Sequence, residues 1–136
     1  MRLFDRHSVI PDPDEVLSAR SALEAQRMER HIAAINKAAR DIVPYINRAF
    51  VSLKNGVMPT EATVKTTGLS FTVAGTLHTT DRIRVNVSMK GSYCLSDPIN
   101  PFDVFGALDK IYSESRYGVY FSQRLAYISI VAEPTK

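Results

Sequence analysis

The side chains best suited to covalent or acid–base chemistry in this chain are one cysteine and three histidines. Cys94 is the only thiol, and it needs a neighbouring base to become a nucleophile. His78 is a base that strand pairing would have to bring near it, whereas His7 and His31 are far away in sequence. A lone cysteine beside a tyrosine and a leucine is more often a buried small hydrophobic side chain. An enzyme that uses Cys94 or a histidine is therefore the least favoured function.

Motifs of the common catalytic classes are absent from the sequence. The chain contains no GxxxxGK[ST] phosphate loop, no GxGxxG fingerprint, no GxSxG elbow and no HExxH pair. It also lacks the CxxC and paired Cys/His spacings of structural zinc sites. Asp103, Asp109 and Glu114 share one expected helix, but their spacings of six and five residues do not place them on one face. We expect no metal and no cofactor, we assign no catalytic residue, and the absence of these motifs weighs against an enzyme.

Basic residues offer a more specific candidate site, the solvent face of a strand that carries Arg82, Arg84 and Lys90. Eleven of the seventeen cations are arginine, which suits bidentate contacts with phosphate. Serine, threonine and asparagine on the same face can contact phosphate or sugar. The phenylalanines of this region alternate inward, so the face offers no ring for base stacking. A nucleic-acid-binding module that uses this face is the second interpretation of function.

A weaker basic row lies on the back of the expected N-terminal helix. It consists of Arg30, Lys37 and Arg48 and is diluted by Asp41. Charge rows of this kind are usually solvated helix faces. These three residues are therefore weaker candidates for binding nucleic acid than the residues of the strand face.

Two groups of residues indicate a protein interface. Near the start of the helix, Val16 and Leu23 point about a third of a turn away from the main apolar stripe and are surrounded by alanines. This early segment is expected to pack against something other than the chain's own sheet. Near the C-terminus, tyrosine and arginine, the mix enriched at protein interfaces, concentrate in one stretch. The interface candidates there are Tyr117, Tyr120, Arg124 and Tyr127.

The elements that position these residues begin with a long helix within residues 1–56. Proline and carboxylates at residues 12–15 favour a helix start, and Lys54-Asn55-Gly56 favours its end. Pro44 removes a backbone donor, so we expect a kink rather than a break because the apolar stripe continues in phase across it. The stripe consists of Met28, Ile32, Ile35, Ala39, Ile42, Ile46, Phe50 and Leu53.

Residues 57–96 switch to the period-two alternation of strands with one buried face. Leu69 to Leu77 and Ile83 to Met89 alternate in this way, and a connection at residues 79–81 predicts an antiparallel hairpin. Gly68 and Gly75 indicate bulges or bends.

Residues 97–136 are expected to form a helix and then a strand. The segment Asn100-Pro101-Phe102-Asp103 is a strong helix start, because it supplies a capping side chain, a proline at the first helical position and a carboxylate in the first turn. Gly106 costs this helix about 1 kcal/mol relative to alanine, so either a close packing contact lies there or the helix is marginal. The stretch from Val119 to Val131 predicts one strand, bent near Leu125 where the alternation changes frame.

The composition and the order of the expected elements indicate the fold class and the cellular location. The 136 residues are 45% hydrophobic and 23% charged, and the segments 1–56, 57–96 and 97–136 carry net charges of +2, +2 and −1. We expect a single α+β domain in which a long kinked N-terminal helix and a shorter second helix pack on one face of a small, mainly antiparallel sheet of three or four strands. One cysteine excludes an internal disulfide, and neither a membrane span nor a secretory leader is expected. The expected location is the cytoplasm.

The favoured function is that of a non-catalytic binding or assembly protein that acts as a homo-oligomer. Its expected partner is itself or another protein, with nucleic acid as the alternative and no membrane. Small size and the lack of catalytic motifs also suit an accessory protein of a phage or mobile element.

Overall fold

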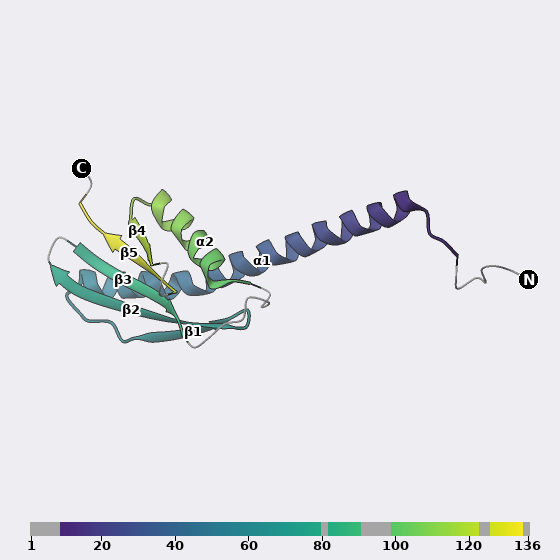
Figure 1. The fold of residues 1–136 in the computed structure, drawn as a ribbon. Helices are drawn as coiled ribbons and strands as arrows, with labels where there is room; N and C mark the ends of the chain where they lie inside the picture. The colour runs from purple at the N-terminus through teal and green to yellow at the C-terminus, as the bar shows by residue number, and fades with distance from the viewer. Residues whose placement is uncertain (1–8, 80–81, 91–98, 123–125, 135–136) are drawn as a thin grey trace, which may run out of the picture. The chain divides into compact units, whose positions relative to one another are not determined.

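A computed structural model describes residues 9–79, 82–90, 99–122 and 126–134, and of residues 77–79 only the backbone. It confirms the α+β prediction, because these ranges contain two helices and an antiparallel sheet (Figure 1). The chain divides into two compact units, Met1–Ile32 and Ala33–Lys136. The elements are α1 (Pro13–Lys54), β1 (Ala62–Thr66), β2 (Leu69–Thr79), β3 (Arg82–Met89), α2 (Pro101–Glu114), β4 (Gly118–Ser122) and β5 (Tyr127–Ala132).

Helix α1 starts and ends where its sequence signals predict. Pro13 is its first residue, Lys54 is its last, and Gly56 follows at a φ of 75°. The helix continues through Pro44 without a break, in agreement with the in-phase stripe. Among the described residues, no helix combines the length and apolarity that a bilayer crossing requires.

Within the described residues the sheet has five strands in the order β1-β2-β3-β5-β4, and every neighbouring pair is antiparallel. Strands β2 and β3 form the predicted hairpin, with a register shift between Leu77 and Thr79. Strand β1 is separate, because Thr67 and Gly68 form a tight turn with φ angles of 50° and 82°. Positive φ at both central residues is what a type I′ hairpin turn requires. Gly68 therefore lies in a turn, which agrees with the bend that the sequence predicts there.

The prediction of one bent C-terminal strand is wrong. The segment folds back on itself as β4 and β5, whose pairing includes Val119 opposite Ile130 and Phe121 opposite Ile128. The predicted frame change therefore falls between two antiparallel strands. Strand β5 lies between β3 and β4, so five strands replace the expected three or four.

One hydrophobic core joins the sheet to α2 and to the later part of α1. The ring of Phe71 in β2 meets Phe105 of α2 edge to face, with centroids 5.9 Å apart. The Tyr112 hydroxyl donates to Asn47 Oδ1 at 2.8 Å and so links α2 to α1. Asn100 caps α2 by accepting from the Phe102 amide at 2.8 Å. The largest fully buried side chains are Phe71, Phe105, Ile42, Ile46, Ile99, Leu108, Ile128 and Ile130.

Because side chains alternate along a strand, burial of one face fixes which residues occupy the other. We call the face opposite this core the open face. Cross-strand pairs place its side chains in rows, for example Thr76, Arg84 and Val131, or Asn86, Ser129 and Tyr120. The open-face residues used below are Arg82, Arg84, Asn86, Ser88, Tyr120, Tyr127, Ser129 and Val131.

Gly75 marks a close approach, whereas Gly106 does not. Gly75 pairs regularly with Val85, so the expected bulge is not there. A Cβ on Gly75 would lie 2.6 Å from Pro59 Cγ and 2.9 Å from Leu53 Cδ1. Nothing lies within 4 Å of a Cβ on Gly106, so no packing contact explains that glycine.

These two glycines give opposite predictions for substitution by alanine. Gly75→Ala forces the Pro59 ring or Leu53 aside and should lower the free energy of unfolding by about 1–3 kcal/mol. Gly106→Ala adds a helix-favouring residue in open space and should raise it by about 1 kcal/mol. Urea denaturation of both variants measures the two changes. Shifts of the same sign would contradict this description of the two sites.

Candidate functional site

Of the four candidate reactive side chains, only that of His31 belongs to the part of the chain that the structure describes. Cys94 and His7 lie outside the described residues, and only the backbone of His78 is described, in β2. His31 lies in α1. Within the described ranges, no three His, Cys, Asp or Glu residues form a group able to hold a metal ion.

The strand-face candidates separate into two places. Arg82 and Arg84 are exposed on the open face of β3, two residues apart. Lys90 follows the end of β3, where its amide donates to the Ser70 carbonyl at 2.8 Å. Six residues of extended chain put about 20 Å between Arg84 and Lys90. The two arginines are thus neighbours at one end of the sheet, and Lys90 belongs to the other end.

The helix-row candidates are largely engaged with the protein itself. Lys37 Nζ lies 2.8 Å from Asp41 Oδ2, which also accepts from the buried Thr66 hydroxyl at 2.7 Å. The hydrogen bonds from Lys37 and then Thr66 lower the pKa of Asp41. This network ties α1 to β1. Arg30 is exposed and lies in the first unit.

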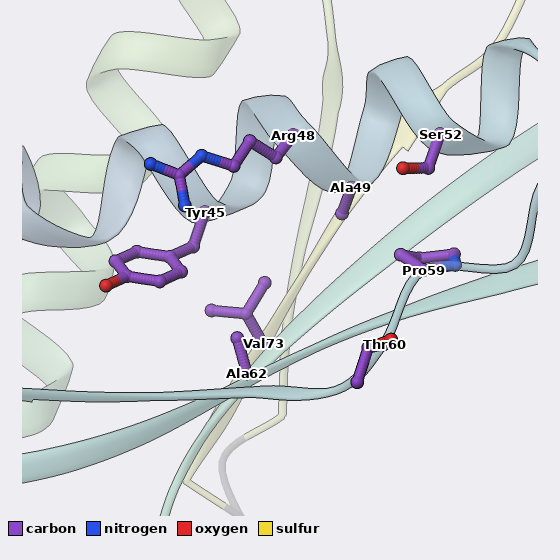
Figure 2. A pocket seen from close by; sticks show the side chains of 8 residues that line it. All are labelled: Tyr45, Arg48, Ala49, Ser52, Pro59, Thr60, Ala62 and Val73. Atoms are coloured by element: carbon purple, nitrogen blue, oxygen red, sulfur yellow. The ribbon is translucent and has the colours of Figure 1, made fainter.

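Arg48 lies beside a small pocket between α1 and the sheet (Figure 2). Its guanidinium carbon is 5.1 Å from the centre of the Tyr45 ring, a cation–π distance. Figure 2 shows Pro59 and Thr60 on the opposite wall from these two side chains. The volume is about 220 Å³. Ligand pockets are usually larger than about 300 Å³, so this pocket is a weak candidate for a ligand site.

The most structured polar group on the open face surrounds Tyr120. Its hydroxyl donates to Glu133 Oε1 at 2.9 Å. Tyr120 pairs with Ser129, so its ring must cross the open-face position of Val131 to reach Glu133. Val131 is accordingly only 1% exposed although it lies on the open face, while Tyr120 itself remains 50% exposed.

The charged groups of this face act on the Tyr120 hydroxyl in opposite directions. The hydrogen bond to Glu133, followed by the charge of Glu133, raises the pKa of the Tyr120 hydroxyl. The charges of Arg82 and Arg84 act in the opposite direction. Tyr120 therefore stays protonated at neutral pH and presents a neutral ring beside two cations.

A hollow of about 450 Å³ lies next to this ring and adds a third arginine. Arg82, Arg116, Gly118, Tyr120 and Glu133 line it. Gly118 leaves room for the acid, since a Cβ there would be 2.5 Å from Glu133 Oε1. The sequence did not reveal Arg116 or Glu133 as site residues, because only the strand order brings them beside β3.

Arg116 holds an unusual backbone position at the end of α2. Its φ is 71°, and its amide donates to the Ser113 carbonyl while the Tyr117 amide donates to the Tyr112 carbonyl. These two bonds define a Schellman motif, in which glycine usually occupies the left-handed position. The Tyr112 and Tyr117 rings make the accompanying apolar contact, with centroids 5.6 Å apart. Arg116 therefore lines the hollow from a left-handed backbone conformation that is strained for any residue with a Cβ.

The C-terminal interface candidates have different environments. Tyr117 packs against Tyr112 and Phe50 and borders the core. Tyr120 is exposed, Tyr127 is half-buried opposite Ser88, and Arg124 lies outside the described residues. Tyr120 and Tyr127 share the open face, so this face does carry aromatic rings. The hairpin alone could not indicate this, because both tyrosines come from other strands.

The N-terminal interface candidates belong to an exposed apolar surface of α1. Val16 and Leu23 are each 48% exposed, and Leu17, Met28 and Ile32 are between 51% and 67% exposed. Met28 and Ile32 continue the stripe whose later members, such as Ile42, are buried. The periodicity predicts the stripe correctly but does not predict that its first part is uncovered.

Arg116 provides a test of the Schellman geometry. Arg116→Gly should raise the free energy of unfolding by about 1 kcal/mol, because glycine adopts positive φ without strain. Arg116→Ala removes the same charge but keeps a Cβ, so it should give no such gain. Chemical denaturation of both variants separates strain from charge. Equal stability of the two would contradict the assignment.

Two surfaces therefore stand out among the described residues, the exposed apolar side chains of α1 and the arginines around Tyr120. Comparison of the chain with protein-family models, with curated proteins and with solved structures finds no match. What the protein does is inferred from the geometry and chemistry of its own residues.

Proposed function

We propose that this protein is a non-catalytic assembly protein whose copies associate through the first part of α1, residues 13–32. The observation that carries the proposal is the exposure of Leu17, Met28 and Ile32, each at least half exposed in the single chain. They continue the helical stripe that is buried from Ala38 onward. Continuous apolar surface of this kind marks interaction sites.

The stability of the helix itself supports association. Most helical stability in proteins comes from packing an apolar face rather than from the helix propensity of the residues. The ion pairs on residues 13–32 are exposed: Glu24 lies 2.8 Å from Arg20 and 3.5 Å from Arg27. Such pairs contribute about 0.2–0.5 kcal/mol each. Burial of an apolar side chain contributes about 1.5–3 kcal/mol, so a partner surface would stabilise this segment far more.

The charge pattern favours a second copy of the same chain as the partner. Asp14 and Glu15 give the first turn of α1 a charge of −2, whereas Arg27, Glu29 and Arg30 give the end of the first unit a net charge of +1. Two such helices in antiparallel orientation would place these acids opposite these bases, which is electrostatically complementary.

We place this assembly in the cytoplasm, because a chain with one cysteine depends on no internal disulfide.

Association through this surface should be lost when carboxylates replace its apolar residues. Leu17→Asp with Met28→Asp would bury two charges in the interface, and the predicted result is a monomer at micromolar concentration. Val16→Asp with Leu23→Asp should act in the same direction. The molar mass from light scattering, measured over a concentration series, is the readout for the wild type and both variants.

The matched control is Ser18→Asp with Gln26→Asp, two exposed positions of the same helix that point away from both apolar lines. It adds the same charge and should leave the oligomer intact. None of the substituted residues belongs to the core, so urea denaturation of the second unit should be unchanged. A monomeric wild type at micromolar concentration would overturn the proposal, as would equal dissociation of the control.

A further inference from the structure

We propose that the open face at Arg82, Arg116 and Tyr120 binds single-stranded nucleic acid, with phosphate on the arginines and a base on the tyrosine ring. This surface is distinct from residues 13–32, so the inference does not rest on the assembly proposed above. It differs from the site expected from sequence, because Arg116 and Tyr120 replace Lys90.

Charge is the first argument. Arg82 and Arg116 line the hollow, Arg84 lies two residues from Arg82 on the same face of β3, and all three are exposed. The neighbouring carboxylate of Glu133 accepts the Tyr120 hydroxyl. Counted over the described residues alone, three arginines against one acid make this surface net positive. Planar guanidinium groups bind phosphate oxygens in bidentate fashion, and their attraction for the sugar–phosphate backbone needs no particular base sequence.

The aromatic ring is the second argument. Tyr120 is 50% exposed, and its hydroxyl is anchored by Glu133. An anchored ring loses little conformational freedom when a base stacks on it. Stacking on aromatic side chains is the usual way in which proteins hold unpaired bases, and it tolerates any base. The carboxylate of Glu133 beside the ring repels phosphate. We therefore expect the base to stack on Tyr120 and the phosphate to bind the arginines.

The shape of the surface favours a strand over a duplex. The hollow of about 450 Å³ lies within the ~300–1,000 Å³ range of small-ligand sites, enough for one nucleotide unit. From Tyr120 the open face continues through Asn86 and Ser129, whose side chains are joined at 2.6 Å, to Ser88 and Tyr127. A ring reaches the face of a base only when that base is not already stacked in a helix.

The test is the binding of an end-labelled oligothymidylate by fluorescence anisotropy over a series of salt concentrations. An oligouridylate distinguishes RNA from DNA, and a duplex of the same length tests the preference for single strands. We expect both single strands to bind more tightly than the duplex. Arg82→Ala with Arg116→Gly should weaken binding at least about tenfold and should reduce the slope of log K against log salt by about 0.7 for each lost phosphate contact.

The tyrosine is tested by a matched pair of variants. Tyr120→Leu removes the ring and should weaken binding by about fivefold or more. Tyr120→Phe keeps the ring and should stay within about twofold of the wild type. Arg40→Ala with Lys110→Ala removes two exposed cations from the two helices and is the control for bulk charge.

The inference is overturned if neither single strand binds at low salt, or if the protein binds the duplex more tightly than the single strands. It is also overturned if the Arg40 and Lys110 variant loses as much affinity as the Arg82 and Arg116 variant. Arg116→Gly is chosen because it relieves strained backbone, and a thermal melt of each variant shows that weakened binding is not unfolding.

Discussion

The burial of one face of the sheet is the constraint on which the rest of the structure depends. Phe71, Val85 and Ile130 are fully buried against the helices, so their neighbours along each strand must point the other way. A slip of one residue in β3 would carry Arg82 and Arg84 into the core. Core packing therefore fixes both the strand register and the position of the arginines.

Local signals in the sequence predicted most of the elements. The alternation in β2 and β3, the Asn100 cap and the Lys54-Asn55-Gly56 helix end are each encoded within a few residues. At the β1–β2 turn the sequence indicates a bulge or bend at Gly68 but not a two-residue hairpin turn, because Thr67 takes a positive φ that β-branched residues rarely adopt. An Asn-Gly pair would have been the recognisable signal.

The candidate site was harder to predict because it depends on strand order. Arg82 was found by alternation, but its neighbours Tyr120, Arg116 and Glu133 come from beyond α2 in the sequence. No spacing in the chain encodes the insertion of β5 between β3 and β4. For α1, likewise, periodicity places Met28 and Ile42 on one stripe but gives no information on what covers each part of it.

The position of β5 also has a consequence for folding kinetics. Among the described residues, three of the four strand pairings join strands that are consecutive in the chain, namely β1–β2, β2–β3 and β4–β5. The fourth pairing, β3–β5, runs from Ile83–Ala132 to Ser88–Tyr127 and must close a loop that contains all of α2. Pairings distant in sequence are the slow ones, so this seam should form last. Arg82 and Tyr120 lie on opposite sides of it, and the surface they share exists only in a chain that has completed folding.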